Sequence, residues 1–399
     1  MRLSYVIISY NRRDTLRRTL GLLADRTPLP SDQWDVWVVD NASTDGTSEM
    51  IAAEFPDIHY IPLPTNIGMP ARNEAFDRAG GEYFICLDDD SYPIDAHAVH
   101  KMLTYLDAEP DAAACVARVE LPDGTPEGPA FPSVVLGGAT CFRAAAIKEV
   151  GGFSREFFRQ AEEYELSCRI WKAGWRIERF EDIVFRHDKV NGPGRASELV
   201  HRMDLRNNLI VAERFLPQPL RRIYRDDWAM RYAAIAKQND HAAAAKKGRR
   251  EARVWAIKEA FRGRQVLDDK AIERVFGLQK QIDAVADWAD CNGIKRVAIA
   301  EFSKNLFATH NACLRAGLEI VHVIDDGPAF WGLNYRGVKI VPSSEVKPES
   351  IDGIVLSNIN PAQIDRRMDA LRGKFAGPIL RLWEPKRLTD PAIPLLAVA

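Results

Sequence analysis

One stretch of the sequence joins an apolar run directly to three carboxylates. Residues 83–87 are mostly apolar, Asp88, Asp89 and Asp90 follow at once, and Pro93 closes the stretch. Such a run predicts a buried strand, whose carboxyl end lies where open α/β sheets bind ligands. Adjacent carboxylates repel one another, which a bound cation such as Mg²⁺ or Mn²⁺ would relieve. A solvated acidic turn is the alternative.

The bulk properties describe an ordinary globular protein. The chain has 399 residues, of which 46% are hydrophobic and 28% charged, a length that suggests two or three domains. The net charge of −2 gives no overall case for nucleic-acid binding. We therefore expect a protein with real hydrophobic cores and no nucleic-acid partner.

The cysteines and the apolar runs indicate the cell compartment in which the protein is expected. The six cysteines are scattered without a Cys-x-x-Cys pair, which argues against a zinc site or a disulfide framework and favours a reducing compartment. The start of the chain turns polar too soon for a signal peptide. No run approaches the roughly 20 apolar residues of a membrane span. We expect a soluble cytoplasmic protein without a transmembrane segment.

The first part of the chain alternates strands with helices. Strands are expected at residues 3–8, 34–39 and 58–62, with helices from about Asp14 and near Thr47. Asp40 follows the second strand, where a carboxylate can accept hydrogen bonds from a ribose hydroxyl or a base N–H. The alternative is a polar turn that caps the next helix.

A second candidate site lies at residues 66–75. Gly68 and Pro70 indicate a turn, after which a helix is expected to start around Ala71. Arg72 and Asn73 would then lie in its first turn, near the positive end of its dipole, which suits phosphate. The alternative is an ordinary helix start with an incidental arginine.

Two glycines mark the next expected strand. After a helix at 97–106 and a strand at 112–121, residues 122–133 form a loop rich in Pro and Gly, long enough to suggest a function. A strand is expected at 134–143. Its Gly137 and Gly138 would let a ligand approach the backbone closely, and a bulge is the alternative.

Glu162 and Glu163 open another expected helix, which Gly174 ends. Carboxylates there usually complement the helix dipole, but one could act as a general base toward an attacking hydroxyl. Short strands are expected at 175–180 and 183–185, and the second delivers His187. That histidine is either structural or a ligand of the expected metal.

In this order the pieces resemble the inverting family-2 glycosyltransferases, which have a GT-A fold. Six stretches carry the resemblance: Val6–Arg12, Val38–Gly46, Asn66–Gly68 with Arg72–Asn73, Leu87–Asp90, Glu162–Arg169 with Gly174, and Arg202–Asn207. Together they span about 210 residues. Each motif is weak alone, whereas the ordered set is specific.

The resemblance implies roles for individual residues. Asp88 and Asp90 match the family's Asp-x-Asp motif, with Asp90 preferred as the direct ligand of Mn²⁺ or Mg²⁺, and His187 matches a further ligand of some relatives. Glu163 matches the catalytic base, which is usually Asp in the family, so that the choice between Glu163 and Glu162 stays open. The expected contacts of the nucleotide-sugar donor are Ser9, Tyr10, Asn11, Asp40, Asn66, Gly68, Arg72, Asn73, Asp88, Asp89 and Gly138.

The implied reaction is a single in-line displacement that inverts the anomeric centre. A UDP-sugar is the expected donor, with dTDP-rhamnose next, and the acceptor is a hydroxyl of a glycan or glycolipid in surface polysaccharide synthesis. A non-catalytic nucleotide-sugar-binding protein is the alternative. A sugar nucleotidyltransferase would require a Gly-rich loop after the first strand, which residues 9–11 do not provide.

The rest of the chain divides in two. Residues 195–264 carry 17 Lys/Arg against 8 Asp/Glu and are expected to be helical. Docking on an anionic membrane or on a glycolipid diphosphate acceptor is one interpretation, and a solvated helical face is the other. Alternating strands and helices from about Gly293 predict a small parallel α/β domain.

The whole chain is therefore expected to be α/β, with three parts. These are a GT-A domain with a mixed sheet at 1–215, a basic helical connection at 216–290 and a Rossmann-like domain at 291–399. The turn at 301–305 lacks the glycine fingerprint of dinucleotide binding. Peripheral contact with the inner face of a membrane and homo-oligomerisation stay open.

Overall fold

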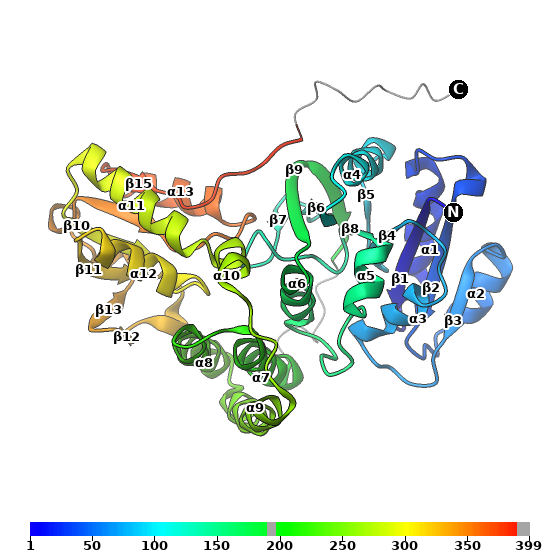
Figure 1. Cartoon of the computed structure of the whole chain (residues 1–399), viewed down its shortest axis with the longest axis horizontal. Helices are drawn as coiled ribbons and strands as arrows, with labels where there is room; N and C mark the ends of the chain where they lie inside the picture. The colour runs from blue at the N-terminus through cyan, green and yellow to red at the C-terminus, as the bar shows by residue number, and fades with distance from the viewer. Residues whose placement is uncertain (190–196, 389–399) are drawn as a thin grey trace. The chain divides into compact units, whose positions relative to one another are not determined.

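The computed structural model describes residues 1–189 and 197–388. It divides into two compact units, which we describe separately (Figure 1). The first holds the described residues within Met1–Gly128, Ser133–Asn191 and Pro385–Ala399, and the second those within Pro129–Pro132 and Gly192–Glu384. The three-part division at 215/216 and 290/291 stays a prediction.

The first unit is built on a nine-stranded mixed sheet in the order β3-β2-β1-β4-β8-β6-β9-β5, with β7 beside β6. Strands β3, β2, β1 and β4 are parallel, β8 is antiparallel to both β4 and β6, and β9 is parallel to β6 but antiparallel to β5. The strands are β1 Leu3–Ser9, β2 Trp34–Asp40, β3 His59–Pro62, β4 Tyr83–Asp88, β5 Ser91–Pro93, β6 Ala112–Glu120, β7 Pro126–Glu127, β8 Thr140–Arg143 and β9 Arg176–His187.

Helices flank this sheet. The α-helices are α1 Arg13–Leu23, α2 Thr47–Glu54, α3 Asn73–Phe76, α4 Ala96–Ala108, α5 Ala144–Val150 and α6 Glu162–Lys172. Short 3₁₀ turns occupy Ala24–Arg26, Ser31–Gln33 and Met69–Arg72. A buried cluster of apolar side chains from α1, α2, α4 and the strands forms the core. The mixed α/β fold predicted from the sequence is confirmed.

Two local expectations were wrong, and a third element is shorter than expected. The two strands expected at 175–180 and 183–185 are one strand, β9, because the sequence break is a shift of register against β6. Of the strand expected at 134–143 only Thr140–Arg143 forms, since the Thr140 hydroxyl closes a turn by bonding both the N–H and the C=O of Leu136. The helix expected from Ala71 is a 3₁₀ turn followed by the four-residue α3.

The second unit begins with helices. Figure 1 shows α7, α8 and α9 side by side. The helices of this part are α7 Glu198–Phe215, α8 Leu220–Gln238, α9 Ala242–Arg262, α10 Asp269–Phe276 and α11 Leu278–Asn292. The stretch Arg202–Asn207, which carries part of the resemblance, lies within α7. The expectation that residues 197–264 are mainly helical is confirmed, whereas 195 and 196 lie outside the described residues.

A second sheet of six strands completes this unit, in the order β12-β13-β11-β10-β14-β15. All neighbours are parallel except β12 and β13. Its elements are β10 Arg296–Ala300, α12 Leu306–Arg315, β11 Glu319–Ile324, β12 Asn334–Tyr335, β13 Val338–Val341, β14 Gly353–Leu356, α13 Ile364–Arg372 and β15 Ile379–Leu380, with 3₁₀ turns at Pro328–Phe330, Ser343–Glu345 and Pro348–Ser350.

Side chains alternate between the two faces of this second sheet. Val297 and Ile299 of β10 pack with α11 and α12, whereas Ala298 and Ala300 pack with α13. A parallel sheet covered by helices on both faces is the expected arrangement. The central position of β10 matches doubly wound sheets, and the name Rossmann-like stays a prediction.

Protein side chains occupy the turn after β10. Lys304 is buried, and its ammonium donates to Asn208 Oδ1 at 2.5 Å and lies over the Trp228 ring. The backbone N–H of Phe302 donates to Asp325 at 2.7 Å. These groups hold the turn by internal contacts, which agrees with the missing glycine fingerprint.

Among the described residues, no helix combines the length and the apolar composition needed to cross a bilayer.

Candidate functional site

Polar side chains gather where parallel strands of the first sheet end. Ser9, the last residue of β1, is level with Asp40 at the end of β2, and Asp88 ends β4 on the other side of β1. Carboxyl ends of parallel strands form the edge at which α/β sheets bind ligands. The apolar run therefore delivers its carboxylates to the predicted edge.

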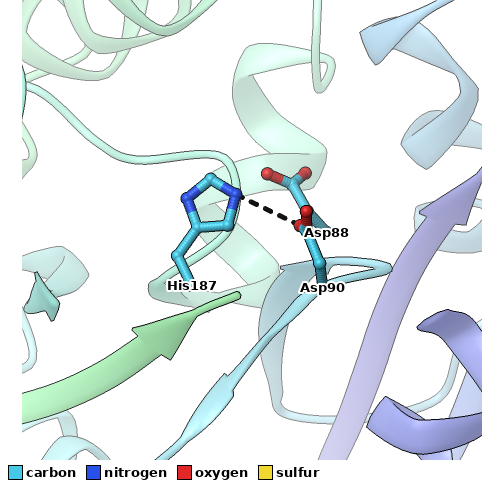
Figure 2. Close-up of side chains that lie close together, drawn as sticks. All are labelled: Asp88, Asp90 and His187. Carbon is cyan, nitrogen blue, oxygen red and sulfur yellow. Dashed lines mark ion pairs between the residues drawn. The ribbon is translucent and has the colours of Figure 1, made fainter. Parts of the chain in front are cut away.

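Figure 2 shows Asp88, Asp90 and His187 together. One potential ligand atom from each lies within 4.8 Å of the other two, and the histidine Nε2 is 3.1 Å from Asp90 Oδ1. Strand pairing produces this arrangement, because Ser91 of β5 is opposite His187 of β9. The structure thus brings the three predicted metal ligands together across two chain segments far apart in sequence.

Two further residues hold this cluster, and the sequence interpretation gave them no role. Arg12 places one nitrogen 2.8 Å from Asp89 Oδ1 and another 2.6 Å from Asp90 Oδ2. Glu127 accepts from His187 Nδ1 at 2.7 Å and also pairs with Lys189. Two features of the sequence could have indicated these roles. Arg12 lies in the turn after the first expected strand, and Glu127 lies in the long loop at 122–133.

Burial and neighbouring charges change the pKa values of the residues in this cluster. Burial alone would lower the pKa of His187, but its hydrogen bonds to Asp90 and Glu127 outweigh burial and raise the pKa to about 10. Burial raises the pKa of Asp89 to about 7 against the opposing charge of Arg12. Burial also acts to raise the pKa of Asp90, but His187 and Arg12 keep that pKa below its ordinary value.

The cluster fits a divalent cation by its donor set. Two carboxylates and an imidazole are common ligands of Mn²⁺ and related ions. Metal-binding histidines usually donate their other ring N–H to a carboxylate, which is the contact of His187 with Glu127. Nε2 would bind a cation in its deprotonated form.

Arg72 contacts this cluster through Asp88. Its side chain is completely buried, and one nitrogen is 2.6 Å from Asp88 Oδ1 and 3.0 Å from the carbonyl of Leu87. The residue belongs to a 3₁₀ turn, so the predicted argument from a helix dipole no longer applies. Arg72 orients Asp88 in this structure, and donor contact stays a prediction.

Several predicted donor contacts have protein partners. Asp40 is buried and accepts from the Tyr60 hydroxyl at 2.5 Å and the Ser43 N–H at 2.9 Å. The Asn73 amide exchanges two hydrogen bonds with the backbone of Phe153. Asp40 and Asn73 thus stabilise neighbouring loops here, and their roles toward a donor stay predictions.

The turn after β1 presents varied side chains. Ser9 donates to Asp89 Oδ2 at 3.1 Å. Asn11 accepts from the Thr44 N–H at 2.7 Å and so ties the first turn to the loop after β2. Tyr10 is 48% exposed, which leaves its ring able to contact a ligand.

Gly68 is required by its surroundings. Its φ is +72°, and a Cβ there would lie 2.0 Å from the carbonyl oxygen of Phe158. Its own N–H donates to Asn66 Oδ1 at 2.9 Å, and the next N–H, of Met69, donates to the same Phe158 carbonyl. The turn at Gly68, which the sequence predicted from Gly68 and Pro70, therefore contacts the loop that precedes α6.

Gly137 and Gly138 join the acidic cluster to the start of α6. The N–H of Gly137 donates to Glu163 Oε1 at 2.6 Å. A Cβ on Gly138 would lie 2.9 Å from Asp88 Oδ2, while its carbonyl accepts from Ser91 Oγ at 2.8 Å. One peptide unit therefore separates the position that contacts Glu163 from the position that contacts Asp88.

Glu162 and Glu163 form a coupled acidic pair at the start of α6. Burial is the main cause that raises the pKa of Glu163 to about 8, and the charge of Glu162 adds to it. Burial likewise raises the pKa of Glu162 to about 7. Among the described residues, no hydrogen-bond partner reaches Glu162 Oε2. A carboxylate with a pKa near neutrality is suited to general-base catalysis.

Part of this sequence is similar to a known family. Residues 4–139 match the model of glycosyl transferase family 2. The matched segment contains the edge formed by β1, β2 and β4 with Asp88 and Asp90. It ends before β8, so Glu162, Glu163 and His187 lie beyond it.

Two curated relatives illustrate the extent of the similarity. An uncharacterized protein of Mycobacterium tuberculosis is 36% identical over 131 residues, which are 31% of this chain and 37% of that protein. The N-acetylglucosaminyl-diphospho-decaprenol L-rhamnosyltransferase of M. tuberculosis is 24% identical over 246 residues, 48% of this chain and 78% of that enzyme. The chain thus covers little more than a third of the first relative.

A solved structure matches over a longer range. S. aureus TarS 1–349, crystallised in complex with UDP-GlcNAc, is similar with a TM-score of 0.50 and 17% identity, covering 85% of this chain and 98% of that one. Similarity at this identity shows the fold alone. It confirms the predicted GT-A fold.

Proposed function

We propose that this protein is a glycosyltransferase that moves a sugar from a nucleoside-diphosphate donor to a hydroxyl of a glycan or glycolipid acceptor. The observation that carries the proposal is the placement of Glu163 and Asp88 on either side of Gly137–Gly138. A proton acceptor is thereby held next to a cluster suited to a cation. The family match at 4–139 and the relative named as a rhamnosyltransferase support sugar transfer in polysaccharide synthesis.

Asp88, Asp90 and His187 are the proposed ligands of Mn²⁺ or Mg²⁺. When bound, the ion would neutralise charge on the donor diphosphate and on the departing nucleoside diphosphate. Arg72 and Arg12 hold the carboxylates in position through Asp88 and Asp90. Glu127 orients the His187 ring from the opposite side.

Glu163 is the proposed base. Its carboxylate takes the proton of the acceptor hydroxyl while that oxygen forms a bond to the anomeric carbon. The bond from the anomeric carbon to the diphosphate oxygen breaks at the same time, and the nucleoside diphosphate leaves. Attack from the face opposite the leaving group inverts the anomeric centre. Glu162 affects the step through its charge beside Glu163.

A UDP-sugar is the first proposed donor and dTDP-rhamnose the second. The complex of TarS with UDP-GlcNAc and the name of the rhamnosyltransferase motivate the two choices. The proposed contacts of the donor are Ser9, Tyr10, Asn11, Asp40, Asn66, Gly68, Arg72, Asn73, Asp88, Asp89 and Gly138.

A thermal-shift screen tests donor and metal together. UDP-, dTDP- and GDP-sugars are added to the full chain with and without Mn²⁺. A ligand at about 100 times its Kd stabilises the native state by about 2.7 kcal/mol, so the true donor should raise the melting temperature more when Mn²⁺ is present. Asp90→Asn should remove the contribution of Mn²⁺. Asp182→Asn is the control, because Asp182 pairs with Lys101 and is not one of the proposed metal ligands.

The screen also has outcomes that count against the proposal. No shift with any of the nucleotide sugars would contradict donor binding, and an equal shift without Mn²⁺ would contradict the metal. A shift without any turnover would favour the non-catalytic binding protein, for which Glu163 has no task.

A further inference from the structure

Helix α9 of the second unit presents an unusual outward face. Val254, Ile257 and Phe261 are 53%, 60% and 87% exposed. Their spacing of three and four residues places them in one stripe along the helix. The same spacing extends toward the N-terminus through Arg250 and Lys247, both exposed. The stripe therefore has a cationic end and an apolar end.

The charges of α9 are sorted by face. Its exposed charged residues are all cationic: Lys246, Lys247, Arg249, Arg250, Arg253, Lys258 and Arg262. Its two carboxylates turn inward, where Glu251 pairs with Arg202 at 2.6 Å and Glu259 with Arg214 at 2.7 Å. The outward face of the helix thus carries cations and large apolar side chains without a carboxylate of its own.

Packing explains why the large side chains of α9 stay outside. The buried positions of the helix include Ala244, Ala245, Gly248 and Ala252. A Cβ on Gly248 would lie 2.2 Å from the carbonyl oxygen of Arg202 in α7, so the two helices approach closely. This small-residue contact fixes α9 without using Ile257 or Phe261, so these two large side chains remain outside.

A cavity of about 400 Å³ opens beside the stripe. Ile257 belongs to both, and Leu209, Ala229 and Ala256 add apolar wall. Cationic and acidic groups also line it, and the acidic Glu213 pairs with Arg225 at 3.2 Å. The surface beside the stripe is therefore hollowed, with an apolar wall and charged groups of both signs.

We propose that this face of α9 docks on a lipid bilayer that contains anionic headgroups. Interfacial helices place large apolar side chains at the boundary of the acyl chains and surround them with Lys and Arg. Cations near an anionic membrane surface add attraction that salt screens. Val254, Ile257 and Phe261 would enter the interface, while Lys247 and Arg250 contact phosphate groups.

A second copy of this chain is a poorer occupant of the face. A twofold contact places the same patch of both subunits together. The exposed cations of one helix would then meet those of the other, and like charges across an interface are costly. The proposal does not depend on the proposed sugar transfer, because no residue of the candidate site lies in α9.

Vesicle sedimentation of the full chain tests the proposal. The vesicles are phosphatidylcholine alone or phosphatidylcholine mixed with phosphatidylglycerol, at low and high NaCl. We expect binding to the mixed vesicles at low salt and little binding to the neutral ones. Lys247→Glu with Arg250→Glu should weaken binding at least tenfold. Each Lys or Arg near an anionic surface contributes about 1 kcal/mol of attraction, and the double variant loses two such contributions. Ile257→Ser with Phe261→Ser should weaken it about as much.

The control variant changes the same kinds of residue elsewhere in the second unit. Leu314 of α12 is 56% exposed and Arg315 follows it on the surface, so Leu314→Ser with Arg315→Glu should bind like the unchanged protein. Equal binding to both vesicle types, or equal loss in the control, would overturn the proposal. The proposal would also be overturned if light scattering showed a concentration-dependent dimer that the change Phe261→Ser dissociates. Circular dichroism checks that every variant remains folded.

Discussion

The fully buried guanidinium of Arg72 lies 2.6 Å from Asp88, whose side chain is 33% exposed. A buried positive charge therefore supports a carboxylate at the open edge of the sheet. Losing one partner of such a pair leaves the other charge without compensation. The relationship makes Arg72 a determinant of both stability and site geometry.

Replacing this arginine tests its structural task. Arg72→Met keeps much of the volume and removes the charge, and we expect the free energy of unfolding to fall by about 2–3 kcal/mol, less than for a fully buried pair. A double-mutant cycle with Asp88→Asn, measured by urea denaturation, should give a coupling energy of about 1 kcal/mol or more. Additive effects of the two changes would show that the pair makes no stabilising contact.

The pH dependence of transfer should report the raised pKa of Glu163. The base acts when ionised, so kcat/KM should increase about tenfold for each pH unit below the pKa of about 8 and level off above it. Initial rates of nucleoside diphosphate release across the pH range provide the measurement. A flat profile in that range would be inconsistent with Glu163 as the base.

The variant Glu162→Gln distinguishes the role of Glu162 in the reaction from that of Glu163. The charge of Glu162 raises the pKa of Glu163, so its removal should move the rate profile to lower pH while activity survives. Loss of activity in Glu162→Gln with an active Glu163→Gln would reverse the two roles. An unshifted profile would show that the two carboxylates are not coupled.

Stability should change with pH in the opposite direction from activity. Folded Glu162 and Glu163 have pKa values of about 7 and 8, above the ordinary 4.5. Their protonated forms stabilise the fold below about pH 4.5, and this contribution is lost as the pH rises through about 7–8. Urea denaturation should show a smaller loss between about pH 5 and pH 8 in Glu162→Gln than in the unchanged protein. Parallel curves would contradict the raised values.

Gly138→Ala tests the close approach to Asp88. The added Cβ would lie 2.9 Å from Asp88 Oδ2, so the carboxylate must shift, and we expect binding of Mn²⁺ to weaken at least about tenfold for a loss of about 1.4 kcal/mol. Titration of the metal followed by melting temperature gives the comparison. Gly21→Ala in α1 is the control, because a Cβ there meets no atom within 4 Å. Equal metal binding by both variants would remove the steric argument.

The sequence predicted those features that local patterns determine. The apolar run before Asp88 predicted the end of β4, and the strands expected at 3–8 and 34–39 differ by one residue from the observed β1 and β2. Buried parallel strands appear as continuous apolar runs, so their position can be found without knowing their partners. The acidic edge of the sheet was predictable for the same reason.

Long-range pairing decided the features that the sequence did not predict. The residues left the role of His187 open and only the resemblance implied a metal ligand, because its place beside Asp90 depends on the pairing of β9 with β5 beyond a register shift, which no pattern near residue 187 specifies. Arg12 bridges Asp89 and Asp90 across 77 and 78 positions of sequence. The helix expected to start around Ala71 is short, a 3₁₀ turn followed by the four-residue α3, and Asn73 of α3 is held by the distant backbone of Phe153.

The most direct test of the account is the turnover of Glu163→Gln, measured as release of nucleoside diphosphate from the donor in the presence of acceptor. Donor binding is followed in parallel by thermal shift with Mn²⁺. The account predicts that release falls by at least about a hundredfold, the usual contribution of a general base, while the donor-induced shift is retained. Turnover equal to that of the unchanged protein would contradict the central claim that Glu163 removes the acceptor proton.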